Sequence, residues 1–273
     1  MLAKMKLLLF LAVTSVLVIS PAPVTTASQA TADTTASAKI WIDRRAELED
    51  YVRAAVVNKL EDIGIGVTKP KRAYLAPGGP VDRMVWKTIA PGIHSGYWES
   101  YKSEIAAYEL DKLLGLDMIP PTVYRQVDNQ PGAAVMWVAP VKSFKDLGGP
   151  PTPPSDKLIR WNRQLVKAKM FDNLIANIDP NLGNWLVDPS WNLILIDHTR
   201  SFTTRKNEVH ALTRIDYDLW ERMKALTVES LTPAIEKWTG KSEIRAIIER
   251  RDRMQVAIDK LVAAKGAAAV FLR

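Results

Sequence analysis

Residues 177–202 read NIDPNLGNWLVDPSWNLILIDHTRSF, with polar groups at both ends of an apolar middle. Two short apolar runs, Trp185–Val187 and Leu193–Ile196, flank a segment rich in Asp, Pro, Ser and Asn. These residue types favour turns because they restrict the backbone or hydrogen-bond to it locally. The stretch therefore predicts a β-hairpin whose turn is centred near Ser190 and Trp191.

The ends of this hairpin carry three polar side chains. A turn with that centre places Asn184, which enters the first strand, opposite Asp197, which leaves the second. Opposed residues have Cβ atoms roughly 4.5 to 5.5 Å apart, so an amide oxygen and a carboxylate can share one hard cation. Asp179 precedes them on the incoming loop. Such oxygen ligands suit Mg²⁺ or Mn²⁺, often together with the phosphates of a nucleotide.

Each of these three residues also has an ordinary structural explanation. Asp and Asn commonly bind backbone amides at hairpin ends and helix caps. For any one of the residues taken alone, capping is the simpler interpretation. Capping does not require an acid at the end of the second strand opposite an Asn, so the three together favour a cation site of the kinase type.

Composition places the chain among globular proteins. It has 273 residues, 47% of them hydrophobic, which suffices for one large domain or two lobes with proper cores. There is no cysteine, which excludes disulfides, thiolate metal sites and thiol catalysis. The formal net charge is +7, but the basic residues are dispersed among acidic ones, so nothing specifically indicates nucleic-acid binding.

The first 32 residues differ from the rest of the chain. Lys4 and Lys6 precede the apolar run Leu7–Ile19, and Pro, Thr, Ser and Ala follow it. This pattern is typical of a secretory signal peptide at residues 1–32, cleaved on export to the periplasm or beyond. A retained membrane anchor is the alternative, but the run is shorter than the roughly 20 residues that a spanning helix needs. No later segment is long enough to span.

Beyond this leader, the pattern changes at a Pro- and Gly-rich stretch. We expect a mixed α/β lobe over 39–147, a linker over 148–156 (GGPPTPPSD) and a mainly helical lobe over 157–273. The elements expected in the first lobe are a helix over 44–60, strands over 72–75 and 84–89, a helix from the N-cap Ser100 to Gly115, and a strand over 133–138. The second lobe is expected to hold helices over 158–174, 217–226, 227–238 and 242–264. The hairpin lies near the junction of the lobes, where ligands usually bind.

The sequence FDNLIANIDPNLGNWLVDPSWNLILIDHTRSF at 171–202 resembles the catalytic core of the atypical kinases related to phosphatidylinositol kinases, HipA-type kinases and secretory-pathway kinases. This resemblance implies an α+β, two-lobed protein-kinase-like fold with a mixed α/β N-lobe and a mainly helical C-lobe. It implies that Asp179 is the catalytic residue, which orients or deprotonates the acceptor hydroxyl. It also implies that Asn184 and Asp197 hold a metal that neutralises charge on the transferring phosphoryl group.

Weaker similarity extends upstream. MVWK at 84–87 looks like the strand with the nucleotide-contacting Lys, and SEIAAYELDKLLGLDMIPPTV at 103–123 looks like the helix with its Glu partner. The resemblance assigns Lys87 to the nucleotide phosphates and Glu104 to the positioning of Lys87, with Glu109 as the competing partner. Without the downstream motif, a strand-edge lysine and acids on a solvated helix face would be the simpler interpretation.

Other positions either extend the family pattern or depart from it. Chain order places Met136, Trp137 and Val138 where these kinases have their adenine-contacting strand. Pro180 and Asn181 stand where many of them have Arg and His, which bears on the loop conformation and the transfer rate. No G-x-G-x-x-G precedes Lys87, so phosphate contacts are expected from another loop, either 77–80 or 92–96.

The sequence leaves three functions open. The first is an exported phosphotransferase that uses ATP with Mg²⁺ or Mn²⁺ and acts on a hydroxyl of a protein, sugar or lipid. The second is a pseudokinase, a binding module that keeps the fold and nucleotide affinity without turnover. In the third, the same site transfers AMP. The acceptor and the oligomeric state are not predicted.

Overall fold

The computed structural model describes residues 37–64 and 69–273. The described residues belong to one compact unit. The signal peptide predicted at residues 1–32 lies outside the described residues. Within the two described ranges, no helix combines the length and apolar character needed to cross a membrane.

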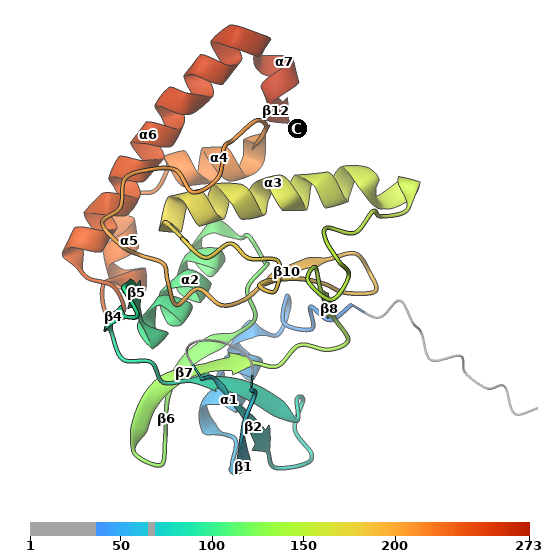
Figure 1. The fold of residues 1–273 in the computed structure, drawn as a ribbon, viewed down its shortest axis with the longest axis vertical. Coiled ribbons are helices and arrows are strands. Elements are labelled where there is room, and N and C mark those ends of the chain that lie inside the picture. The colour runs from blue at the N-terminus through green and yellow to red at the C-terminus, as the bar shows by residue number, and fades with distance from the viewer. Residues whose placement is uncertain (1–36, 65–68) are drawn as a thin grey trace, which may run out of the picture. The chain divides into compact units, whose positions relative to one another are not determined.

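A five-stranded antiparallel sheet organises the N-terminal half (Figure 1), with the strand order β1-β2-β3-β7-β6. The strands are β1 Val57–Asp62, β2 Lys71–Leu75, β3 Arg83–Lys87, β6 Thr122–Val127 and β7 Gln130–Met136. Two helices accompany the sheet, α1 Arg45–Ala54 and α2 Tyr101–Leu114. A short hairpin of β4 Gly92–His94 and β5 Tyr97–Glu99 connects β3 to α2.

Helices α1 and α2 cover opposite faces of this sheet. Ala134 and Met136 of β7 share a core with Leu48 of α1. Ala133, which directly precedes Ala134, packs instead with Tyr101 of α2. Because successive side chains of a strand point to opposite faces, the two helices must lie on different sides of β7. Each face of the central strands is therefore buried.

The predicted boundaries of α2 are confirmed, and those of α1 are corrected. The Ser100 side chain accepts a hydrogen bond from the amide of Lys102, and Gly115 ends α2 in a left-handed conformation with φ 54°. The predicted helix over 44–60 is too long, because α1 stops at Ala54 and the following residues form β1. Strand β1 pairs with β2, a tertiary contact that local periodicity does not reveal.

Helices dominate the C-terminal half, as the sequence predicts (Figure 1). They are the 3₁₀ turn Ser155–Lys157, α3 Leu158–Ile175, α4 Tyr217–Lys224, α5 Val228–Ile235, α6 Lys241–Lys265 and α7 Ala267–Val270. Two short parallel strands, β11 Ile215–Asp216 and β12 Phe271–Leu272, join the end of the chain to the start of α4. The apolar faces of these helices share one core with α2.

The predicted hairpin is present and lies between the two cores. It consists of β9 Trp185–Val187 and β10 Leu193–Leu195, and it pairs with β8 Lys142–Ser143. Trp185 packs in the helical core, whereas Leu186 and Ile194 pack in the core of the five-stranded sheet. Strand β8 precedes the linker predicted at 148–156. The segment before that linker therefore already pairs with a strand of the hairpin. The lobe boundaries themselves stay predictions.

The hairpin register differs by one residue from the prediction. Trp185 pairs with Leu195, and the amide of Ile196 donates to the carbonyl of Asn184 at 3.0 Å, so Asn184 faces Ile196 rather than Asp197. The amide of Asp188 donates to the carbonyl of Asn192 at 3.2 Å, and Trp191 takes a left-handed φ of 62°. This three-residue loop is centred on position 190, and a one-residue shift changes which residues face each other.

Candidate active site

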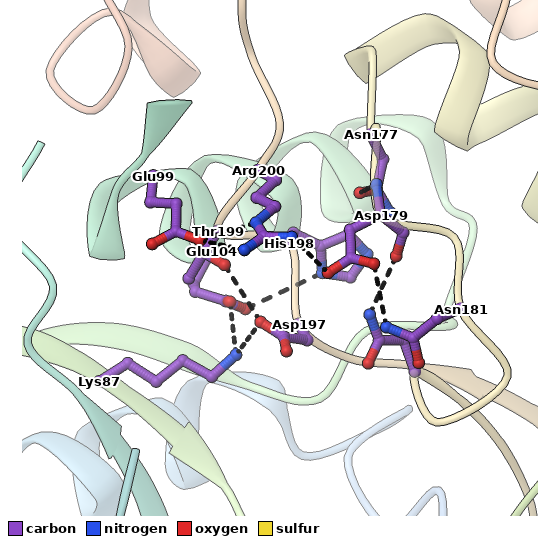
Figure 2. Close-up of polar contacts among 11 residues, drawn as sticks. Lys87, Glu99, Glu104, Asn177, Asp179, Asn181, Asp197, His198, Thr199 and Arg200 are labelled. Carbon is purple, nitrogen blue, oxygen red and sulfur yellow. Dashed lines mark hydrogen bonds and ion pairs between the residues drawn. The ribbon is translucent and has the colours of Figure 1, made fainter. Parts of the chain in front are cut away.

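Lys87 lies between two carboxylates from different elements (Figure 2). Its Nζ is 2.6 Å from Glu104 Oε1 on α2 and 2.7 Å from Asp197 Oδ1, just after β10. Lys87 is 6% exposed and Glu104 is 2% exposed. A buried ammonium requires such partners, because an unpaired charge in the interior is strongly unfavourable. This cluster joins the sheet, α2 and the hairpin.

Strand alternation explains the direction of Lys87. Met84 and Trp86 of β3 point into the core shared with α1. Lys87 follows Trp86 directly, so its side chain leaves the other face of the strand, the face that α2 covers. Its burial follows from the strand geometry and the position of α2.

Helix geometry separates the two glutamates that competed in the sequence. Glu104 lies in the first turn of α2, where the helix dipole favours an anion. Glu109 lies five residues later, on another face of the helix, and pairs with Lys112 at 3.0 Å. The structure thus brings Glu104, and not Glu109, to Lys87.

The electrostatics of the cluster favour the charged forms of Lys87 and Asp197. Burial lowers the pKa of Lys87, but the charges of Asp197 and Glu104 outweigh it and hold that pKa well above its ordinary value. Burial likewise raises the pKa of Asp197, and the ammonium of Lys87 reverses this and lowers the pKa. His198 is buried behind Glu104, and burial lowers its pKa, so its neutral form is favoured.

Asp197 departs from the extended strand that precedes it. Its φ is 64°, a left-handed conformation that is uncommon for a residue other than glycine. Thr199 Oγ1 donates to Asp197 Oδ1 at 3.2 Å, the same oxygen that Lys87 contacts. This left-handed conformation ends the alternation of side-chain directions that β10 begins. Asp197 is also the residue whose carboxylate contacts Lys87.

Asp179 lies on the loop between α3 and β9, and that loop is tied to the end of α3. Asn177 connects the two, because its Oδ1 accepts from the amide of Asp179 at 3.3 Å and its Nδ2 donates to Asp172 Oδ1 at 2.9 Å. Asp172 is buried and also contacts Nε2 of His210 at 3.1 Å. The short ties hold the backbone of the Asp179 loop against the helical core.

The side chain of Asn184 hydrogen-bonds to the backbone of the Asp179 loop. Its Nδ2 donates to the backbone carbonyl of Asp179 at 3.1 Å. In the described part of the chain, no hydrogen bond joins Asn184 to Asp197, and neither Asn184 Oδ1 nor Asp197 Oδ2 has a hydrogen-bond partner. These two oxygens suit a hard cation. No group of three or more His, Cys, Asp or Glu side chains that could hold a metal occurs among the described residues. A cation here would therefore need phosphate or water as further ligands.

An ion pair that the sequence reasoning missed lies beside these residues (Figure 2). Arg200 Nη2 is 2.6 Å from Oε1 of the buried Glu99, and Arg200 Nη1 is 3.5 Å from Asp179 Oδ2. The guanidinium carbon of Arg200 also lies 4.5 Å from the ring centroid of Tyr97. Because Glu99 and Arg200 are far apart in sequence, no local signal could have paired them.

The predicted adenine-contacting residues lie apart from this cluster. Met136 and Val138 are buried in the sheet core. The guanidinium carbons of Arg72 and Arg83 lie 4.8 and 5.1 Å from the ring centroid of Trp137. Among the described residues, no hydrogen bond, ion pair or cation–π contact joins these three side chains to Lys87 or Asp197, and their adenine-binding role stays a prediction.

One of the two loops predicted to contact phosphate is displaced from the site. Residues 77–80 form the turn between β2 and β3, at the end of β3 away from Lys87. Tyr51 of α1 donates to the carbonyl of Val81 at 3.1 Å, so this turn packs on α1. Phosphate contact by residues 77–80 stays a prediction. Residues 92–96 lie in the β4–β5 hairpin that follows Lys87, and their role stays a prediction.

Solved structures of atypical kinases share this architecture. A Fam20 protein from hydra, determined with sugar, matches with a TM-score of 0.65 and 17% identity, over 84% of this chain and 92% of its own. The Golgi casein kinase with Mn/ADP bound matches with a TM-score of 0.62 and 13% identity, over 83% and 78%. The Helicobacter pylori proinflammatory kinase CtkA matches with a TM-score of 0.54 and 12% identity, over 78% and 97%. No protein-family model and no curated protein matches the sequence.

These similarities define the fold of the chain. It is the two-lobed kinase-like fold, so the predicted α+β class is confirmed. The predicted resemblance to atypical kinases is confirmed at the level of fold. At such low identities the likeness extends to the fold alone, and the chemistry has to be argued from the site.

Proposed function

We propose that the protein is a phosphotransferase that uses ATP with Mg²⁺ or Mn²⁺ and phosphorylates a hydroxyl group. One observation carries the proposal: Lys87 Nζ lies within 2.7 Å of carboxylates from α2 and from the end of the hairpin. Lys87 and its Glu partner on a helix, together with an Asp after the hairpin, are the groups that kinases use to hold nucleotide phosphates and a metal. The Golgi casein kinase structure with Mn/ADP supports the same choice of nucleotide and metal.

Each residue has a distinct task in this proposal. Lys87 binds the nucleotide phosphates, and Glu104 holds Lys87 in position. Asn184 and Asp197 hold the metal, which neutralises charge on the phosphoryl oxygens when bound. Met136, Trp137 and Val138 border the adenine.

The transfer itself is a single displacement. The acceptor oxygen forms a bond to the γ-phosphorus while the bond from that phosphorus to the β–γ bridging oxygen breaks, and ADP leaves. The proton of the acceptor hydroxyl passes to the carboxylate of Asp179. Lys87 stays protonated throughout, because its neighbouring carboxylates hold its pKa well above the ordinary value.

We propose that the chain is exported before it acts. The signal-peptide pattern at residues 1–32 motivates this proposal. The Golgi location in the name of one structural neighbour is compatible with it. The proposed acceptor is a hydroxyl of a protein, a sugar or a lipid.

A pseudokinase remains the second candidate, and the Asp179 loop favours it. Asn181 Nδ2 donates to Asp179 Oδ1 at 3.1 Å, so a neighbouring side chain occupies one oxygen of the proposed base. Such a protein would bind nucleotide without turnover. Transfer of AMP is a further possibility for the same site, and the mass of the product distinguishes it from phosphate transfer.

Thermal unfolding with and without ATP and each metal tests the proposal. At ligand near 100 times its dissociation constant, binding should stabilise the protein by about 2.7 kcal/mol, a Tm shift of roughly 5 to 11 °C at this size. Asp197→Ala should abolish the metal-dependent shift, whereas Glu109→Gln, a matched change on the solvated side of α2, should keep it. No shift with either metal across the common nucleotides would contradict nucleotide binding, and a shift without any product would favour the pseudokinase.

A further inference from the structure

The direction of the Asp179 carboxylate depends on one residue from outside its loop. Asn181, which contacts Asp179 Oδ1, is itself exposed on that loop. Pro180 carries neither a charge nor a backbone N–H. Among the described residues, Arg200 is the only side chain from another segment that contacts the carboxylate of Asp179, at 3.5 Å from Oδ2.

Arg200 is held firmly enough to act as a support. Its Nε donates to Glu99 Oε1 at 2.7 Å, and its Nη2 lies 2.6 Å from the same oxygen. The ring of Tyr97 covers the guanidinium, an arrangement that adds a cation–π attraction. The side chain of Arg200 is 16% exposed, whereas that of Glu99 is 1% exposed. A planar guanidinium that is hydrogen-bonded along one edge and covered by a ring on one face has little conformational freedom left.

Backbone contacts keep the same segments together. The amide of Ile178, next to Asp179, donates to the carbonyl of Arg200 at 3.4 Å. On the other side, the amide of Ser100 at the start of α2 donates to the carbonyl of Thr199 at 3.0 Å. Residues 199 and 200 therefore bridge β5 and α2 to the Asp179 loop, and Figure 2 shows Arg200 between Glu99 and Asp179.

We infer that Arg200 is a positioning residue for Asp179 and that buried Glu99 is its anchor. The inference rests on the proposed function, in which Asp179 receives the proton of the acceptor. The guanidinium holds Asp179 Oδ2 from outside the loop, whereas Asn181 contacts Oδ1 from an exposed position within it. A misdirected base slows transfer without weakening nucleotide binding, because the groups assigned to the nucleotide and the metal are untouched.

The test removes both charges of the pair together. Arg200→Met alone would leave the Glu99 carboxylate buried and unpaired, which destabilises the fold. The double variant Arg200→Met with Glu99→Gln avoids that penalty. We expect kcat to fall about 10- to 100-fold, with the KM for ATP and the nucleotide-dependent Tm shift kept. Amide hydrogen exchange in residues 177–184 should become faster.

A matched pair elsewhere in the molecule provides the control. Arg163 Nε lies 2.8 Å from Oδ2 of the buried Asp216, away from the Lys87 cluster. Arg163→Met with Asp216→Asn removes an equivalent ion pair from α3 and the start of α4. This variant should lose stability to a similar extent while its kcat and the exchange in residues 177–184 stay unchanged.

The outcomes separate this inference from the proposed function. If the parent protein transfers phosphate and the double variant keeps its kcat, the inference is overturned while the function stands. If the parent protein transfers nothing, the proposed function fails. Amide hydrogen exchange in residues 177–184 then still tests whether Arg200 holds the Asp179 loop. Unchanged exchange in residues 177–184 of the double variant overturns the inference in either case.

Discussion

The surroundings of Asp179, the proposed catalytic residue, are only partly local in sequence. Its backbone amide is bound by Asn177, two residues away, but its carboxylate depends on Arg200 from beyond the hairpin. Lys87 is similar, because both of its carboxylate partners come from other elements. At this scale the residue type decides which chemistry is possible, and its neighbours decide whether the group is ionised and where it points.

The proposed role of Asp179 can be tested by an isosteric change. Asp179→Asn keeps the shape of the side chain but cannot accept the proton of the acceptor. We expect transfer to fall about 10²- to 10⁴-fold, the usual contribution of a positioned base. The nucleotide-dependent Tm shift should be kept, because Lys87, Asn184 and Asp197 are unchanged. Single-turnover transfer at the parent rate would contradict the role of Asp179.

Helix α2 carries two buried acids with different partners. Glu104 in its first turn contacts Lys87, whereas Asp111 near its end is fully buried and supports the following turn. Asp111 Oδ1 accepts from the amides of Met118 and Ile119 at 2.8 and 3.2 Å. Burial raises the pKa of Asp111 to about 6, although these hydrogen bonds and the charge of Arg45 oppose the rise.

This raised pKa predicts a pH dependence of stability. Between the ordinary pKa of 3.8 and about 6, the folded state binds more protons at Asp111 than the unfolded state does. The contribution of Asp111 to stability therefore falls as pH rises through that window, by up to about 3 kcal/mol. Asp111→Asn keeps an acceptor for both amides and lacks the titration. Its free energy of unfolding relative to the parent should rise from pH 4 to 6 in denaturant titrations, and a pH-independent difference would contradict this.

The molecule as a whole is joined through the hairpin. Alternating side chains of β9 and β10 enter two cores, so that Trp185 packs with the helices and Ile194 packs with the sheet. The amino-terminal segment adds another link, because the amide of Ala38 donates to Oδ2 of Asp188 in the hairpin turn at 2.9 Å. The described residues accordingly belong to one compact unit.

We therefore expect residues 35–273 to unfold in one transition. Ile194→Ala, at a fully buried position, should destabilise the protein by about 2 to 5 kcal/mol. That corresponds to a Tm lower by roughly 4 to 20 °C in both near-UV circular dichroism and tryptophan fluorescence. Ile159→Ala on α3, where the side chain is 78% exposed, should change Tm little. Two separate transitions in the Ile194 variant would contradict a single cooperative unit.

The sequence by itself determined the elements that depend on local patterns. The turn residues and apolar runs of the hairpin, the Ser100 cap and the Gly115 end of α2 act over a few residues, so their physics can be read from the chain. Lys87, Glu104 and Asp197 were also expected together from resemblance, and the structure places them in contact. The helix over 44–60 failed because strand pairing of β1 overrides helical periodicity.

Only the tertiary structure decided how distant groups meet. It selected Glu104 over Glu109, set the hairpin register one residue away from the expected one, and turned Asp197 through a left-handed conformation. It also paired Arg200 with Glu99 beside Asp179. These outcomes depend on burial and on packing between segments far apart in the chain. An ion pair with a buried partner such as Glu99 forms only when folding brings the two segments together, and no local pattern encodes that condition.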